Sequence, residues 1–157
     1  MKYTIRIYLE SKNDVTREIE ISAENNLLDL HKIITQSCNL NDKELASFHL
    51  TNDEFELLKE IPLIPIEENT KESMEQILIK ELLINKDDRL IYIYDYMKMW
   101  RFLVELKQVS TLKITIPQCI FKSGEMPKQA PNITFDIQNQ DEDEFSEDDS
   151  FNEYNEY

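Results

Sequence analysis

Runs of alternating and helically spaced apolar residues divide the first part of the chain into elements. Apolar side chains alternate with polar ones over residues 3–9 and again over residues 15–21, where Arg17 takes one of the alternating positions. A period of two predicts half-buried strands, and the turn residues between the two runs predict a hairpin. Apolar residues then recur at steps of three and four over residues 27–38, which predicts a helix with one apolar face.

The next part of the chain passes from a strand into an acidic loop. Residues 46–50 predict a third strand, so the chain begins strand, strand, helix, strand, which is a β-grasp-like start. Acidic residues and prolines over residues 52–72 predict an exposed loop with an edge strand near 61–66, because proline cannot donate to an inner ladder. The apolar spacing over residues 71–84 predicts a short helix.

The strongest strand pattern lies in the second half of the chain. Residues 90–94 are continuously apolar or aromatic, which is typical of a strand covered on both faces. The alternation over residues 100–106 completes a hairpin that we place at the centre of the sheet, and residues 112–116 predict a last strand before the irregular stretch 117–131. We therefore predict a single α+β domain over residues 1–135, built on a mixed sheet.

Negative charge is concentrated at the C-terminal end of the sequence. The chain has 32 acidic and 17 basic residues, for a formal net charge of −15, and residues 136–157 hold ten of the acidic residues and none of the basic ones. Such a segment cannot bury enough apolar surface to offset its ordering entropy, so we predict a disordered acidic tail. The tail adds solubility alone, docks on a basic groove of a protein partner through its aromatic side chains, or folds back over a basic patch of its own domain. These docking candidates are Phe145, Phe151, Tyr154 and Tyr157.

Composition argues against several classes of function. The mildly acidic body lacks the clustered lysines and arginines that bind nucleic acids or anionic membranes, so neither is expected as a partner. One glycine rules out a glycine-rich phosphate loop, and two cysteines and two histidines are too few for a zinc finger, so no metal or cofactor is expected. No signal peptide or membrane-spanning run is apparent, which predicts a cytoplasmic protein with reduced cysteines.

Three residues are candidates for chemistry. His31 lies on the apolar side of the predicted helix, where it is either a ligand or general base, or a buried histidine hydrogen-bonded to the backbone. As a base it needs a partner, and Asp95 at the hairpin turn is the candidate, because strand alternation turns His49 away from its apolar neighbours. Cys119 lies in a loop near Lys122, where it is either a reactive thiol or an inert small hydrophobe.

Four motifs follow one another in a fixed order over residues 1–130. They are Arg17-Glu18-Ile19, Leu30-His31-Lys32-Ile33-Ile34, the hairpin run from Asp88 to Asp95 with Trp100-Arg101, and Pro117-Gln118-Cys119 through Gly124 to Pro127. Together they resemble the Ri-plasmid ORF-three-like family of uncharacterised bacterial proteins, which are often encoded on plasmids and near mobile elements. The acidic, aromatic tail is similar to that of a divergent branch of this family in Bacteroides-like bacteria.

The resemblance implies a shared fold but not a shared site. The family has Gly-Asp in the hairpin turn, and this chain has Tyr96-Met97-Lys98-Met99 there. Phe102 stands where the family has a histidine after Trp-Arg. The polar residues that could form a metal or catalytic site in the family are therefore mostly replaced in this chain.

Two main hypotheses about function remain open at this point. The leading one is a non-enzymatic protein-interaction module that makes contact through the acidic tail or the 52–72 loop. The alternative is a divergent enzyme or metal-dependent domain with a site around His31, Asp95 and Cys119, which requires these three side chains to converge at one pocket. Handling of nucleic acid is a third possibility that rests only on the association of the family with mobile elements.

Overall fold

A computed structural model describes residues 1–65 and 72–131 of the chain, and the structural statements below concern those residues. The predicted tail, residues 136–157, and the end of the predicted domain lie outside them. The elements are β1 (Lys2–Leu9), β2 (Thr16–Ser22), α1 (Leu27–Ser37), β3 (Ala46–Leu50), β4 (Glu60–Pro62), the 3₁₀ turn η1 (Met74–Gln76), α2 (Ile79–Leu82), β5 (Arg89–Tyr94), β6 (Trp100–Ser110) and β7 (Gln118–Ser123).

One antiparallel sheet dominates the described part of the chain. Its strands follow the order β4-β3-β5-β6-β1-β2-β7, and every pair of neighbours is antiparallel. The prediction of an α+β domain with a mixed sheet is therefore wrong, and the architecture is predominantly β. The helices among the described residues are α1, with 11 residues, and α2, with 4 residues. Antiparallel neighbours need no helical crossover between them, and this explains why so little helix is present.

The β-grasp-like start is also corrected by the strand order. The chain does begin strand, strand, helix, strand, but β5 and β6 lie between β3 and β1 in the sheet. Strand β1 instead pairs with β2 on one side and with β6 on the other. The order of elements in a sequence does not specify which later strand will occupy a given edge, so the pattern alone could not exclude the β-grasp pairing.

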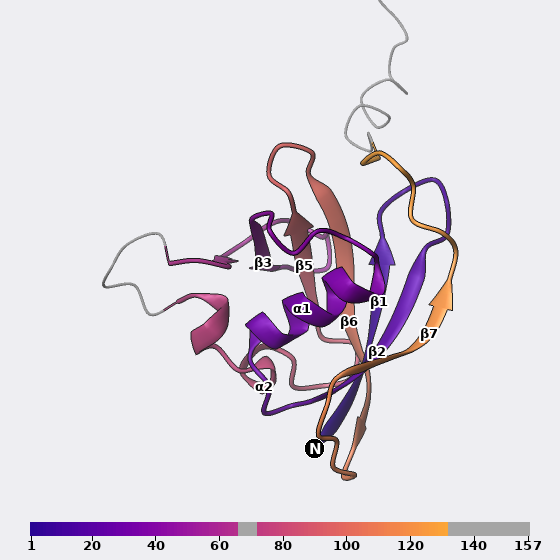
Figure 1. The fold of residues 1–157 in the computed structure, drawn as a ribbon. Helices are drawn as coiled ribbons and strands as arrows, with labels where there is room; N and C mark the ends of the chain where they lie inside the picture. Colours follow the sequence, from indigo (N-terminus) through magenta and orange to yellow (C-terminus); the bar gives the residue numbers. More distant parts are fainter. Residues whose placement is uncertain (66–71, 132–157) are drawn as a thin grey trace, which may run out of the picture.

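Helix α1 lies across one face of the sheet (Figure 1). Buried apolar side chains of the helix and of the strands together form the core. Asn26 precedes the helix as its N-cap: its side-chain Oδ1 accepts a hydrogen bond from the backbone N–H of Asp29 at 2.9 Å. The helix is followed by Cys38 as its C-cap, and then by Asn39, which adopts a left-handed conformation with φ 56°. Fully buried side chains of this core include Ile5, Ile19, Leu30, Ile34, Phe48, Tyr92 and Phe102.

A loop covers part of the opposite face of the sheet. Residues 51–59 leave β3 and return beside it, so that the N–H of Leu58 donates to the carbonyl of Leu50 at 2.9 Å. Two arginines hold this loop at Phe55: the Arg89 guanidinium lies 5.1 Å from its ring centroid, and Arg101 Nη2 donates to its carbonyl at 2.6 Å. Strand β5 is consequently buried on both faces, as its continuous apolar sequence predicts.

The sheet edges agree with the sequence at one end and differ from it at the other. The predicted edge strand in the acidic loop is present as the short β4, and the predicted central hairpin is β5–β6. The predicted last strand over residues 112–116 is wrong, because β7 forms instead at residues 118–123, within the stretch we expected to be irregular. A bulge leaves Ile120 without a register partner in β2, and this interrupts the alternation that would have indicated a strand.

Among the described residues, no helix is long and apolar enough to cross a membrane.

Candidate functional site

His31 lies on the buried side of helix α1, facing the core. Its Nδ1 is 2.7 Å from the hydroxyl oxygen of Tyr92 on β5, and the two ring centroids are 5.8 Å apart. The side chain is 2% exposed, and burial lowers the pKa of His31 to about 4. The imidazole is therefore neutral near pH 7, and its hydrogen-bond partner is a tyrosine side chain where we expected a backbone group.

Asp95 and Cys119 lie in different parts of the sheet from each other. The Asp95 carboxylate accepts hydrogen bonds from the backbone N–H groups of Met97 and Lys98 at 3.1 and 3.4 Å, and so it stabilises the β5–β6 turn. The Cys119 thiol donates to the carbonyl of Phe121 at 3.4 Å on the edge strand β7. Strands β6, β1 and β2 separate β5 from β7.

The three candidate residues do not form one cluster in the part of the chain that the structure describes. No hydrogen bond, ion pair or ring contact joins any two of His31, Asp95 and Cys119 there. His49 lies on the loop-covered face, where its Nε2 is 2.9 Å from Ser47 Oγ. Within residues 1–65 and 72–131, no group of three His, Cys, Asp or Glu side chains is arranged to hold a metal ion.

A cleft of about 630 Å³ opens where the end of α1, the start of β6 and the loop after β7 meet. We call it the Arg17 cleft. Arg17, on β2, lines this cleft and is only 5% exposed. Residues that line the cleft include Arg17, Cys38, Leu40, Trp100, Lys122 and Lys128.

Arg17 is held in place entirely by backbone carbonyl groups. Its Nε donates to the carbonyl of Ser37 at 3.0 Å, at the C-terminal end of α1. Its Nη1 lies 2.9 Å from the carbonyl oxygen of Thr16 and 3.1 Å from those of Ser123 and Gly124. No carboxylate of the described residues pairs with the guanidinium, and Nη2 makes no hydrogen bond there.

Gly124 fixes the loop on one side of the Arg17 cleft. It has a φ of +82°, in the left-handed region that favours glycine. A Cβ at this position would lie 2.0 Å from the carbonyl oxygen of Asp14 in the β1–β2 turn. The single glycine of the sequence therefore lets the loop approach that turn, and it places its own carbonyl against Arg17.

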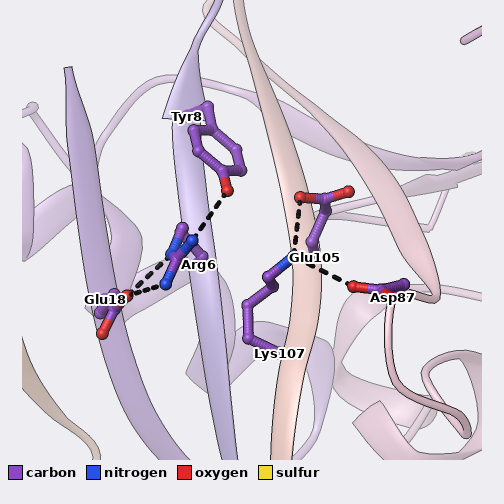
Figure 2. A network of polar contacts seen from close by, with 6 residues as sticks. All are labelled: Arg6, Tyr8, Glu18, Asp87, Glu105 and Lys107. Atoms are coloured by element: carbon purple, nitrogen blue, oxygen red, sulfur yellow. Dashed lines mark hydrogen bonds and ion pairs between the residues drawn. The ribbon is translucent and has the colours of Figure 1, made fainter. Parts of the chain in front are cut away.

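The face of the sheet away from α1 carries charges that pair with one another. Figure 2 shows Arg6 directed at Glu18 and Tyr8, and Lys107 between Glu105 and Asp87. Arg6 Nη2 lies 2.6 Å from a Glu18 oxygen, and Lys107 Nζ lies 3.0 Å from an Asp87 oxygen. Because these charges are paired with one another, they attract a charged ligand only weakly. The lysines of the Arg17 cleft, in contrast, make no ion pair within the described residues.

A smaller hollow of about 410 Å³ lies beside the loop over the opposite face. It is lined in part by Thr51, Asp53, Asp87, Asp88 and Arg89. Two of its three carboxylates already have partners: Asp88 accepts from the backbone N–H groups of Ile84 and Asn85 after α2, and Asp87 binds Lys107. Among the described residues, this hollow therefore has fewer charged side chains without a partner than the Arg17 cleft has.

Sequence reasoning missed the Arg17 cleft, although one signal for it was present. Arg17 occupies an inward position in the alternation of β2, where the neighbouring inward side chains are apolar. A charged residue at such a position must be hydrogen-bonded or paired when it is buried. The convergence of Trp100 and Lys122 on the same space depends on strand pairing, so no local pattern could have indicated it.

Comparisons with known proteins bear on the fold and the family. A crystal structure of MM3350, a protein of unknown function from Methanosarcina mazei Go1, is similar with a TM-score of 0.63 and 21% sequence identity. The similarity covers 77% of this chain and 68% of that one, and at this identity it concerns the fold alone. No curated protein matches the chain. The sequence profile of the plasmid pRiA4b ORF-3-like proteins matches residues 1–132, so the chain belongs to that family.

Proposed function

We propose that the chain is a non-enzymatic module that binds another protein. The observation that carries this proposal is a group of exposed apolar side chains on and before the edge strand β7. We call this group the β7 surface. Its members are Leu112, Ile116, Ile120 and Phe121, with exposed fractions of 63, 72, 47 and 49%.

The open edge of β7 suits the addition of a strand from a partner. Strand β7 pairs with β2 on one side and has no neighbour on its other side among the described strands. An unpaired edge presents backbone N–H and C=O groups that an extended segment can satisfy. Exposed apolar residues beside such an edge supply the side-chain contacts that favour one partner over others.

The chemistry of the tail suggests what kind of partner fits. The acidic, aromatic segment that contains Phe145, Phe151, Tyr154 and Tyr157 follows β7 in the sequence. A partner with an extended apolar segment flanked by basic residues would match both the β7 surface and this segment. The 52–72 loop is the second candidate contact, since the described side chains from Asp53 to Lys59 are exposed. A cytoplasmic location is part of the proposal and rests on the sequence.

The enzymatic alternative has less support. It requires His31, Asp95 and Cys119 to act together, and their contacts lie with Tyr92, the β5–β6 turn and the β7 backbone respectively.

The proposal can be tested by affinity capture from a native bacterial lysate with full-length variants. Ile116→Ser with Ile120→Ser changes the β7 surface, and a fourfold serine variant at the aromatic positions changes the tail. Met97→Ser is the matched control, because Met97 is 93% exposed at the β5–β6 turn. We expect a protein retained by the wild type and the control to be lost from the β7 variant, the tail variant or both. Retention that none of these substitutions alters would contradict the proposed contact surfaces.

A further inference from the structure

The Arg17 cleft contains more positive charge than its own residues neutralise. We propose that it binds a small phosphate monoester, with the phosphate at Arg17, Lys122 and Lys128. This inference concerns a different site from the β7 surface, and it does not depend on the binding of a protein partner.

The balance of charge in the cleft favours a dianion. Arg17, Lys122 and Lys128 contribute three positive charges, and Glu125 is the carboxylate among the lining residues. The C-terminal end of α1 adds about half a negative charge through its backbone dipoles, next to the Arg17 guanidinium. About 1.5 positive charges remain, and a phosphate monoester carries about −1.5 to −2 at pH 7.

Among the described residues, the two lysines of the cleft and one nitrogen of Arg17 have no partner. Neither Lys122 nor Lys128 makes an ion pair within the described residues, and neither pairs with Glu125. Both lysines are exposed at the mouth of the cleft, whereas Arg17 lies deeper. The free Nη2 group of Arg17 offers two N–H donors, and guanidinium groups bind phosphate oxygens through such donors.

The Arg17 side chain is already ordered before any ligand arrives. Carbonyl groups of Ser37, Thr16, Ser123 and Gly124 hold its Nε and Nη1 atoms. Ordering a long side chain on binding normally costs free energy, so a side chain that is fixed in advance raises the affinity. The buried arginine therefore functions as a prepared anion site as well as a tie between α1 and the loop after β7.

The remaining wall of the cleft is apolar and indicates an organic ester more than free phosphate. Leu40, Trp100, Met126 and Pro127 line it together with the cations. Binding pockets for small molecules commonly combine such an apolar wall with a few polar groups that fix the orientation of the ligand. The phosphate would meet Arg17 and the lysines, and the organic group would lie along this wall.

The test titrates phenyl phosphate into the full-length chain. Trp100 is the single tryptophan of the sequence and lines the cleft, so its fluorescence reports on this site directly. We expect a saturable change in fluorescence and a matching dissociation constant by isothermal titration calorimetry. Inorganic phosphate and benzoate, which lack the organic group and the second charge respectively, should each bind about tenfold more weakly or worse.

Variants on the surface of the cleft separate binding from folding. Lys122→Gln with Lys128→Gln removes two exposed charges and should weaken phenyl phosphate binding about tenfold or more. Lys113→Gln, at an exposed lysine outside the cleft lining, and Ile116→Ser, on the β7 surface, should leave the affinity within about twofold. The proposal is overturned by the absence of saturable binding in both measurements or by an unchanged affinity in the double lysine variant. Equal affinity for inorganic phosphate or for benzoate would overturn the assignment to a phosphate monoester.

Discussion

His31 Nδ1 and the hydroxyl group of Tyr92 form a hydrogen bond of 2.7 Å between helix α1 and the central strand β5. The two residues are 61 positions apart in the sequence, and both are almost completely buried. Tyr92 also packs against Phe48 and Phe102, with ring centroids 4.9 and 5.7 Å away. The polar pair therefore lies inside an aromatic cluster and orients the helix relative to the sheet.

The titration of His31 should make the fold sensitive to acid. The folded state holds the pKa of His31 at about 4, below its ordinary value of 6.5, because burial disfavours the charged ring. The unfolded chain therefore binds a proton first as the pH falls, and stability decreases from pH 6.5 toward pH 4. We expect the loss of stability in urea unfolding between pH 7 and pH 5 to be about 2 kcal/mol larger in the wild type than in His31→Gln. A smaller loss remains in the variant, because burial also lowers the pKa of His49. The same pH dependence in both proteins would contradict this.

Tyr92→Phe should destabilise the protein without altering its fold. The substitution keeps the aromatic packing and leaves His31 Nδ1 buried without its partner, a loss that costs about 1–3 kcal/mol. Chemical denaturation should show a lower midpoint with an unchanged slope. Tyr8→Phe is the matched control, because the Tyr8 hydroxyl only meets Arg6 at 3.4 Å on the charged face. A loss of equal size in both variants would show that the buried pair has no special role.

Gly124→Ala should be strongly destabilising for a small change in volume. The backbone at this position has a φ of +82°, and the new Cβ would meet the carbonyl oxygen of Asp14 at 2.0 Å. We expect a loss of more than ~2 kcal/mol, since left-handed backbone and a clash with main-chain atoms both oppose alanine. Ser123→Ala, one residue earlier on β7, should change the free energy of unfolding by less than about 0.5 kcal/mol. Tolerance of alanine at position 124 would show that the loop can move away from the turn.

Removing one charge from the face shown in Figure 2 should have a small effect. Arg6 and Glu18 are partly exposed, with 37 and 20% of their side-chain surfaces accessible. Ion pairs in such positions contribute less than about 1 kcal/mol and are screened by salt. We expect Glu18→Gln to lower the free energy of unfolding by that amount at low ionic strength and by less in high salt. A large effect that persists in high salt would contradict a screened surface pair.

The two thiols should differ in their reactivity toward a disulfide reagent. Cys38 is 1% exposed, and burial raises the pKa of its thiol, whereas Cys119 is partly exposed on β7. Only the thiolate reacts, so the native protein should show one accessible thiol, and urea should release the second. Cys119→Ser should abolish the reaction of the native protein. Rapid modification of Cys38 in that variant would show that the Arg17 cleft opens more widely than the structure indicates.

Comparison of β5 with β7 shows why some strands were predictable from the sequence and others were not. Residues 90–94 of β5 are buried on both faces of the sheet, and these five side chains are all apolar or aromatic. Strand β7 lies at the edge, is mostly exposed and contains a bulge, so no burial pattern forces its sequence to alternate. Apolar residues alternate over residues 112–116 although Leu112 and Ile116 are exposed. This alternation led to the incorrect prediction of a strand there.

For the candidate site residues, the sequence predicted the position within a helix or strand but not the contacts with other elements. The sequence placed His31 on the buried side of a helix, but its partner Tyr92 depends on the packing of that helix against β5. The sequence placed Arg17 at an alternating position of a predicted strand and gave no sign of a binding site. The cleft around Arg17 forms only because β7 and the end of α1 pack next to it. Sites assembled from distant segments depend on which strands pair, and local residue patterns do not reveal that pairing.

The position of β1 between β2 and β6 affects how the chain folds during its synthesis on the ribosome. Its first neighbour, β2, emerges from the ribosome soon after it, but its second neighbour, β6, spans Trp100–Ser110 and emerges much later. During synthesis one side of β1 therefore remains open until most of the described residues have been translated. Pairings of such long range slow folding and expose strand edges to other chains. We expect the nascent chain to depend on chaperones or on rapid translation through β6 more than a protein of this size with local pairings would.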